Sequence, residues 1–234
     1  MGCIALYGSY PFLKKAMKKE DETKSILIVR HGKFLNPGGV VYNRDSVMKK
    51  SDWVHVSPEG IIQMMALGKL IKEKGFRTQY LWTSPSVRAK ESAEALNRVL
   101  QVDNFRVVED LDDVYCPGPY RMGMTMVELE TLGGDVYGGM YGEVESPEDV
   151  AARLSRVYWR MADLLTPGET GILVTHGDSS AWLIRKLVFG SLPEPKHLRD
   201  DFYLPKAGAY VTVIGSKKNL IHSFYLTDPR GEIY

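Results

Sequence analysis

Two apolar segments that both end in His-Gly constrain the fold of this chain more than any other feature. Residues 25–32 read SILIVRHG and residues 171–177 read GILVTHG. Short apolar runs rich in β-branched residues predict buried strands, and open α/β sheets build their sites where such strands end. Histidines delivered from two distant segments converge only if the two strands are neighbours. The sequence therefore predicts His31 and His176 at one edge of a layered α/β sheet.

The rest of the chain alternates predicted strands and helices, which favours a mostly parallel sheet covered by helices. The predicted strands are 25–30, 79–83, 105–108 and 171–175, with an antiparallel pair at 209–214 and 220–226. The predicted helices are 58–74, 85–100, 147–165 and 177–188, with a short one near 124–131. The predicted fold class is α/β, a three-layer α/β/α sandwich with a mostly parallel central sheet and an antiparallel edge.

Three of these helix starts rest on Ser-Pro pairs, at Ser57-Pro58, Ser84-Pro85 and Ser146-Pro147. A serine before a helix caps its free N–H groups, and proline suits the first helical position because its missing N–H is not needed there. We therefore expect each serine to be the N-cap residue of the helix that follows it.

The bulk composition fits one domain. With 234 residues, of which 44% are hydrophobic and 25% charged, the chain can supply a full core. We expect a charged N-terminal leader at 1–24 and a single domain at 25–234. A Gly- and Tyr-rich insertion at about 115–145 is expected to act as a mobile lid over the site.

Charge and cysteine content exclude several classes of protein. The net charge of +1 gives no electrostatic argument for binding nucleic acid or an anionic membrane. The two cysteines, Cys3 and Cys116, are too few for a disulfide framework, and no Cys/His spacing typical of a metal site occurs. No apolar run approaches the roughly 20 residues of a membrane span, and no secretory signal is evident. We therefore expect a cytoplasmic protein without nucleic-acid or membrane partners.

The residues around the two histidines favour phosphate chemistry. Arg30 precedes His31, and Arg88 falls in the first turn of the helix predicted after strand 79–83, at the same sheet edge. Arginine binds phosphate through two parallel hydrogen bonds, and a helix N-terminus favours an anion. A neutral imidazole can attack phosphorus, which makes His31 the candidate nucleophile. No Walker-type loop or dinucleotide fingerprint occurs, which argues against a nucleotide cofactor.

Four segments of the chain resemble, in the same order, the signature blocks of the histidine phosphatase superfamily: VRHGKFLN, SPEGIIQMMALG, TSPSVRAKESAEAL and VTHGDSSAWLIRKL. The resemblance spans about residues 25–190 and is to the shorter, phosphoglycerate-mutase-like branch. It implies a phosphoglycerate-mutase-like fold, no metal or organic cofactor, and a phosphohistidine mechanism. Carried over by position, it implies that His31 is the nucleophile and that the phosphate pocket consists of Arg30, Arg88, His176 and Asn36.

The resemblance also implies a carboxyl group that protonates the leaving oxygen, commonly a glutamate in a Leu-x-Glu segment after the third strand. Residues 109–113 read EDLDD, so the matching residue is Asp113. The alternatives that stay open are Glu109, Asp110 and Asp112. Neighbouring carboxylates favour the protonated form that such an acid needs.

Three further basic residues are candidate substrate contacts. Lys33 stands where many relatives have Glu or Gln, and Arg44 and Arg121 lie in the first long loop and in the predicted lid. Residues typical of the glycolytic mutases are not recognisable between the proton donor and the next helix.

The expected activity is therefore that of a metal-independent phosphomonoester hydrolase, acting through a phosphohistidine on His31. The alternatives are a phosphoglycerate-type phosphomutase and a non-catalytic phosphate-binding interaction module. The expected partner is a small phosphorylated substrate or a phosphoprotein. A second copy of the chain is a further candidate partner, because AYVTVIG at 209–215 could supply an edge strand for a dimer.

Overall fold

A computed structural model of the chain describes residues 23–36, 54–115, 144–199 and 201–227, to which the following refers. The strands are β1 (Lys24–Arg30), β2 (Arg77–Thr83), β3 (Asn104–Val107), β4 (Glu169–Thr175), β5 (Ala209–Ile214) and β6 (Leu220–Tyr225). The α-helices are α2 (Pro58–Glu73), α3 (Val87–Leu100), α5 (Pro147–Leu164) and α6 (Gly177–Phe189). Two short 3-10 helices are η3 (Glu109–Leu111) and η4 (Pro195–His197).

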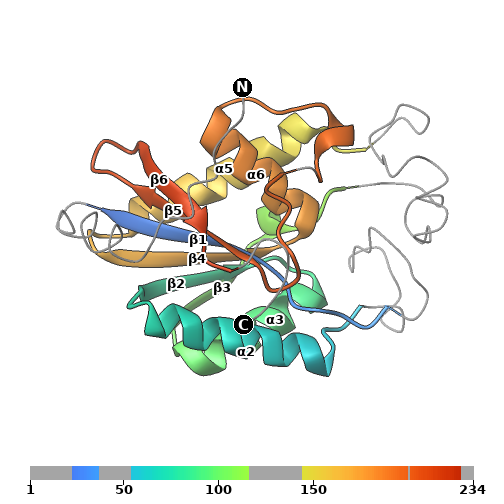
Figure 1. Cartoon of the computed structure of the whole chain (residues 1–234), viewed down its shortest axis with the longest axis vertical. Helices are drawn as coiled ribbons and strands as arrows, with labels where there is room; N and C mark the ends of the chain where they lie inside the picture. The colour runs from blue at the N-terminus through green and yellow to red at the C-terminus, as the bar shows by residue number, and fades with distance from the viewer. Residues whose placement is uncertain (1–22, 37–53, 116–143, 200, 228–234) are drawn as a thin grey trace.

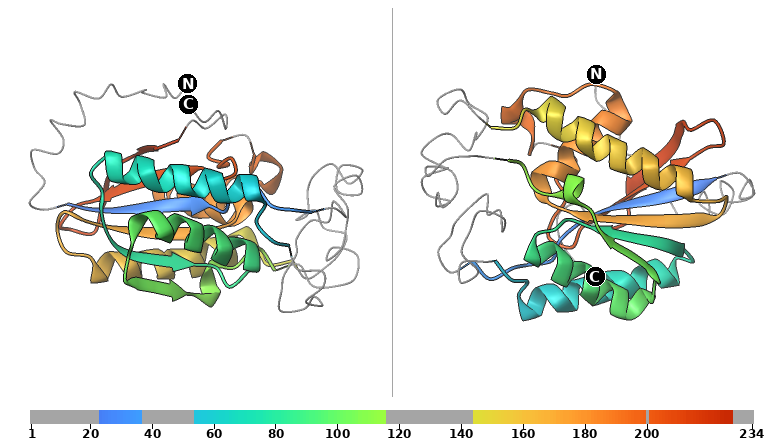
Figure 2. Two further views of the ribbon diagram at one scale, coloured as in Figure 1. Left: turned by 90° about the horizontal axis from the view of Figure 1, so that it is seen from below. Right: turned by 180° about the vertical axis from the view of Figure 1, so that it is seen from behind.

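The strands form one sheet in the order β3-β2-β4-β1-β5-β6. Helices α2 and α3 cover one face and α5 and α6 the other, as Figure 1 and the two views of Figure 2 show. Strands β1, β2, β3 and β4 are parallel, whereas β5 and β6 form an antiparallel edge. The predicted three-layer fold is confirmed.

Strand β1 is buried on both faces, which explains its unbroken apolar sequence. Ile26 and Ile28 pack in the core under α5 and α6, while Leu27 and Val29 pack in the core under α2 and α3. All four side chains are fully buried. A parallel strand covered by helices on both sides has no solvent face and so shows no polar alternation.

Two of the three Ser-Pro helix starts are confirmed. Ser57 Oγ accepts a hydrogen bond from Gly60 N (3.0 Å) at the start of α2. Ser146 Oγ likewise accepts from Asp149 N (3.1 Å) at the start of α5.

The third predicted start is wrong. Helix α3 begins at Val87, and its N-cap residue is Ser86 rather than Ser84. The hydroxyl of Ser84 is instead within hydrogen-bond distance of His176 and an aspartate, so tertiary contacts outweigh the local capping preference at this position.

Several sequence predictions fall on residues that the structure does not describe. Most of the leader at 1–24, the short helix near 124–131 and most of the lid at 115–145 lie outside the described residues. The two ends of the 115–145 segment meet, because Glu145 N donates to Tyr115 O (2.9 Å). In the described part of the chain, no helix combines the length and apolar character that a membrane crossing requires.

Candidate functional site

The ends of β1 and β4 bring the two histidines together. The strands pair in parallel up to Arg30 and Thr175, and His31 N then donates to Thr175 O (3.0 Å). The rings of His31 and His176 are 5.3 Å apart between centroids. Both side chains are buried, with exposed fractions of 2% and 1%. The convergence expected from the two His-Gly segments therefore follows from main-chain pairing alone.

The glycine after each histidine is required by close packing. A Cβ on Gly32 would lie 2.6 Å from Gly60 O at the start of α2. A Cβ on Gly177 would lie 2.6 Å from the hydroxyl of Tyr203 and 2.8 Å from Cζ of Arg30. The repeated His-Gly sequence thus leaves room for a helix start in one case and for an arginine in the other.

The main chain sets the chemical form of His31. Its Nδ1 is 2.9 Å from Gly32 O. A carbonyl only accepts, so Nδ1 carries the proton and Nε2 keeps its lone pair. Burial, the largest cause, holds the pKa of His31 well below its ordinary value of 6.5. Four basic neighbours act in the same direction: Lys206, Arg88, His176 and Arg30. The ring is therefore neutral at neutral pH.

The side chain of Arg30 is held against the segment that precedes β5. Its Nη1 donates to Leu204 O (2.7 Å), and its guanidinium lies 4.8 Å from the ring centre of Tyr203. The hydroxyl of Tyr203 donates to Asp178 on α6 (2.8 Å). Nε of Arg30 is buried and has no acceptor among the described residues.

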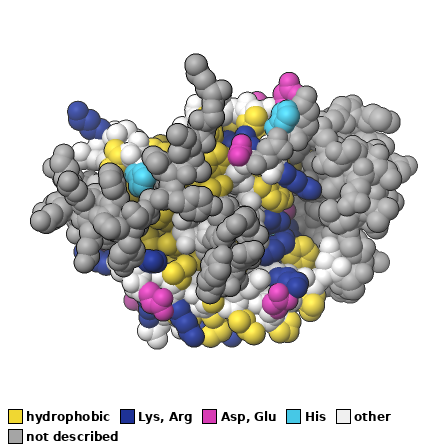
Figure 3. All heavy atoms as spheres, viewed as in Figure 1, with side chains coloured by type: hydrophobic (Ala, Val, Ile, Leu, Met, Phe, Trp, Pro, Cys, Tyr) yellow, Lys and Arg dark blue, Asp and Glu magenta, His cyan; other side chains and the backbone are white. Residues whose placement is uncertain are grey.

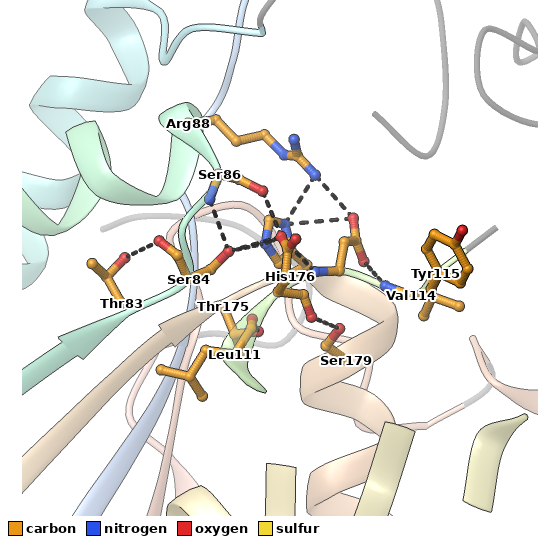
Figure 4. A network of polar contacts seen from close by, with 12 residues as sticks. Thr83, Ser84, Ser86, Arg88, Leu111, Val114, Tyr115, Thr175, His176 and Ser179 are labelled. Carbon is orange, nitrogen blue, oxygen red and sulfur yellow. Dashed lines mark hydrogen bonds and ion pairs between the residues drawn. The ribbon is translucent and has the colours of Figure 1, made fainter. Parts of the chain in front are cut away.

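Arg88 connects His176 to a carboxylate of the site (Figure 4). Its Nη2 donates to Asp113 Oδ2 (2.9 Å) and to His176 Nδ1 (3.1 Å). Because a guanidinium can only donate, His176 Nδ1 accepts, and the proton of the neutral ring is on Nε2. That Nε2 donates a hydrogen bond to Ser84 Oγ (2.8 Å).

The hydrogen-bond chain continues from Ser84 to a buried carboxylate. Asp112 Oδ1 accepts from Ser84 Oγ (3.2 Å), from Ser86 Oγ (2.7 Å) and from Asp113 N (2.9 Å). Burial and then the charge of Arg88 lower the pKa of His176, and Asp112 acts in the opposite direction. The chain from His176 through Ser84 to Asp112 fixes which nitrogen of His176 carries the proton.

The four carboxylates that the sequence left open as proton donors have different surroundings. Asp113 contacts the basic residues of the site, with Oδ2 3.4 Å from His176 Nδ1 in addition to its bond with Arg88. Asp112 is engaged by two serines. Glu109 is exposed, and Asp110 lies 3.8 Å from an exposed arginine on α5.

A buried arginine on α5, which the sequence analysis did not single out, holds this acidic segment in place. Arg153 Nη1 donates to Asp110 O and Asp112 O (both 2.8 Å), and Nη2 donates to Asp113 O (3.0 Å). Nε and Nη2 of Arg153 also bind the two carboxylate oxygens of Glu145 at 2.6 and 2.9 Å. One guanidinium therefore fixes the main chain of residues 110–113.

A lysine that the sequence analysis also missed lies next to His31. Lys206 Nζ is 4.1 Å from the ring centre of Phe34, and the ring of Phe34 contacts that of His31 edge-on, with 5.3 Å between centroids. Burial, followed by the charges of Arg30 and Arg88, lowers the pKa of Lys206 from 10.5 to about 6. Several basic side chains lie on the part of the surface at which β1 ends (Figure 3).

The remaining predicted site residues lie at the edge of the described structure or beyond it. Asn36 is partly buried and is the last described residue before the first long loop. Lys33 is exposed, and its Nζ pairs with Glu59 on α2 (2.5 Å). Arg44 and Arg121 lie outside the described residues. Within residues 23–36, 54–115, 144–199 and 201–227, no group of three or more His, Cys, Asp or Glu side chains could hold a metal ion.

Comparison with solved structures finds the same fold in several proteins, two of them named as phosphatases. A mycobacterial glucosyl-3-phosphoglycerate phosphatase in complex with VO3 superposes with a TM-score of 0.65 at 19% identity, covering 86% of this chain and 96% of that chain. The phosphoserine phosphatase of Entamoeba histolytica, in complex with phosphoserine, gives 0.62 at 18% identity, with coverages of 86% and 96%. Bacillus stearothermophilus YhfR gives 0.65 at 20% identity, with coverages of 90% and 98%.

Sequence comparisons point to a family rather than to a near relative. No curated protein matches the chain significantly. A family model, described as histidine phosphatase superfamily (branch 1), matches residues 26–224. That range includes both histidines and the glycines after them, Arg88 and all of the sheet except the first two residues of β1 and the last residue of β6. The chain therefore belongs to branch 1 of the histidine phosphatase superfamily.

Proposed function

We propose that this protein is a phosphomonoester hydrolase that works through a phosphohistidine on His31. The observation that carries the proposal is the state of that ring: it is buried and neutral, its Nδ1 is bound to Gly32 O, and Lys206, Arg88 and Arg30 lie close enough to lower its pKa. A neutral imidazole whose free Nε2 faces a cationic pocket is a nucleophile for a phosphoryl group.

In the first step, His31 Nε2 attacks phosphorus, and the bond between phosphorus and the ester oxygen breaks. The leaving oxygen takes a proton from the carboxyl group of Asp113. In the second step, water attacks phosphorus, Asp113 takes one of its protons, and the bond between phosphorus and Nε2 breaks. Inorganic phosphate leaves, and His31 returns to its starting form.

Arg88 holds the proposed proton donor in the empty site and releases it when a phosphoryl group binds. In the empty site, the guanidinium binds both Asp113 and His176. A phosphoryl group bound by Arg30 and Arg88 competes for those donors and so frees the carboxyl group of Asp113 from Arg88.

The residues of the site indicate that the substrate carries a phosphoryl group, but they do not indicate the rest of the molecule. Two of the three neighbours named above are phosphatases of glucosyl-3-phosphoglycerate and of phosphoserine, both phosphate monoesters of small molecules that carry a carboxylate. Esters of this kind are therefore the first natural substrates to test on this chain.

The test is phosphate release from p-nitrophenyl phosphate in the presence of a chelator, with wild type, His31→Ala and the control His222→Ala. His222 is exposed on β6, away from the site. We expect His31→Ala to lose at least about 10³-fold in kcat, and His222→Ala to match wild type. Wild-type protein quenched in alkali during turnover should carry one phosphoryl group on the peptide that contains His31.

Equal activity of wild type and His31→Ala would remove His31 from the chemistry. Isomerisation of a phosphoglycerate faster than its hydrolysis would identify a mutase instead. Binding of phosphate esters without any release of phosphate would identify a binding module.

A further inference from the structure

One lysine of the site, Lys206, is largely desolvated and has no paired carboxylate among the described residues. Lys206 Nζ forms no hydrogen bond or ion pair with any described residue, and its closest recorded contact is the face of Phe34 at 4.1 Å. Arg88, by contrast, is paired with Asp113. Lys206 is partly buried, and a charged amine without a counter-ion is costly there, so a ligand that supplies negative charge stabilises its protonated form.

Two contacts place this lysine next to the candidate nucleophile. The ring of Phe34 that lies under Nζ also contacts the ring of His31. The residue that follows Lys206 is bound to the same histidine, because Ala207 N donates to His31 O (3.1 Å). Lys206 also exerts the largest effect of any single charge on the pKa of His31.

The main chain holds Lys206 in this position from both sides. On one side, Leu204 O accepts a hydrogen bond from Nη1 of Arg30 (2.7 Å). On the other side, Gly208 O accepts a hydrogen bond from the main-chain N of Arg30 (3.0 Å). Ala207 has φ of +58°, in the left-handed region that a residue with a Cβ seldom occupies. Such backbone strain persists only where the surroundings enforce it.

We propose that Lys206 is a phosphoryl-binding residue: its ammonium contacts the oxygens of the phosphoryl group at His31, and the amine takes up its proton from solvent as the dianion binds. The inference deepens the function proposed above and rests on its assignment of His31.

The charges around Lys206 explain why proton uptake accompanies binding. Arg30 from β1 and Arg88 from α3 disfavour the ammonium, while Asp113 and Asp178 from α6 favour it. His31 and His176 face the same space. With the site empty, burial and the two arginines dominate. A bound phosphoryl dianion adds two negative charges and reverses this balance.

The test uses tungstate, a tetrahedral dianion that holds no proton near pH 7.5, as a probe of the pocket. Isothermal titration calorimetry at pH 7.5, in two buffers with different ionisation enthalpies, gives both the affinity and the number of protons taken up. The proteins compared are wild type, Lys206→Met, Lys206→Arg and the control Lys217→Met, which changes an exposed lysine in the β5–β6 turn.

We expect Lys206→Met to bind tungstate about tenfold more weakly than wild type, since a charged hydrogen bond is lost, and to take up fewer protons. Lys206→Arg should keep the affinity within about threefold, because arginine supplies a permanent charge, and should show the same reduced proton uptake. Lys217→Met should behave as wild type in both respects.

Unchanged affinity and unchanged proton uptake in Lys206→Met would overturn the proposal. Weaker binding with unchanged proton uptake would overturn the protonation of Lys206 on binding. The experiment measures no turnover, so its outcome is separate from that of the proposed hydrolase: a protein that releases no phosphate can still bind tungstate through Lys206. Circular dichroism and thermal unfolding show whether each variant is folded. If Lys206→Met is not folded, the proton uptake of Lys206→Arg still tests the proposal.

Discussion

The two halves of the candidate site are held in place by different means. The basic half lies at the ends of β1 and β4, where main-chain pairing alone brings His31 next to His176. The acidic half, Asp112 and Asp113, follows a short 3-10 helix and belongs to no strand or α-helix. Its main chain is positioned by the side chain of Arg153, and its buried carboxylate by two serines.

This difference matters for how variants should behave. The basic half depends on a sheet whose strands are buried on both faces, so its geometry tolerates loss of a side chain. The acidic half depends on a few side-chain hydrogen bonds from α5 and from the start of α3. One substitution can therefore move Asp113, the proposed proton donor, while His31, the proposed nucleophile, stays in place. A shift of about 1 Å in a catalytic group can cost on the order of 10²-fold in rate.

The largest effect is expected where the halves meet, at Arg88. Arg88→Met removes the donor shared by Asp113 and His176 and also a phosphate ligand, and we expect kcat/KM to fall about 10²- to 10³-fold. Arg88→Lys should recover only part of this loss, because an ammonium cannot reproduce a planar fork of donors. Steady-state kinetics on p-nitrophenyl phosphate give the measurement. A loss below tenfold in Arg88→Met would contradict the placement of this arginine at the phosphoryl group.

The second-largest effect is expected at Arg153, whose loss should disturb the acidic half of the site and leave the basic half in place. Arg153→Leu should displace Asp113 and lower kcat by about 10- to 100-fold on alkyl phosphates, whose leaving oxygen needs a proton. On p-nitrophenyl phosphate, whose leaving group needs little help, the loss should stay below about threefold. The ratio of the two rates is therefore the informative quantity, since a general loss of folded protein would lower both equally.

The control for this comparison is Arg156→Leu, on the same helix but with a side chain that is 66% exposed. It should leave both rates unchanged. Removing the buried Arg153 leaves the largely buried carboxylate of Glu145 without its ion-pair partner. Arg153→Lys, which keeps a positive charge, therefore serves as the milder variant. Equal losses on both substrates in a folded Arg153→Lys protein would show that Arg153 does not act through the proton donor.

The same contrast explains what could be predicted from the sequence. The fold and the convergence of His31 with His176 were predictable, because buried strands, helix caps and His-Gly junctions are local patterns. Ser84 was misassigned as a helix cap, since the pattern carries no information about its distant partner His176. A local rule thus fails where a side chain is engaged by the site.

The two missed residues left weaker signals. Arg153 occupies the apolar stripe of α5, between the buried residues Val150 and Val157, and a charged residue at such a position is a reason to look for buried partners. Lys206 lies in an irregular segment before β5, where neither periodicity nor capping constrains a side chain. Only the pairing of Ala207 and Gly208 with the end of β1 brings it to the site.

A smaller effect is expected from the link between the halves that runs through Ser84. Ser84→Ala leaves Nε2 of His176 without its acceptor, at a cost of about 1 kcal/mol, or about fivefold in kcat/KM. Ser155→Ala is the matched control, because Ser155 Oγ is buried without a partner among the described residues. No difference between the two variants in kcat/KM would mean that this hydrogen bond does not position His176.

The smallest effect concerns stability, and it tests whether the main chain forces Lys206 into its place. The pKa of Lys206 is about 6 in the folded protein and 10.5 for a free lysine side chain. Between these values the unfolded chain holds one more proton than the folded one, so this lysine destabilises the fold most at low pH and less as pH rises. Lys206→Met should therefore increase the free energy of unfolding by about 1 kcal/mol at pH 7, a figure reduced for partial exposure. The gain should shrink towards pH 10.

Urea unfolding of wild type, Lys206→Met and Lys217→Met at pH 6.5 and 9.5 measures this gain. A gain that is equal at both pH values would show that the amine is not desolvated. A gain that follows the expected pH dependence, together with weaker tungstate binding, would show that the fold keeps a destabilising lysine for its ligand.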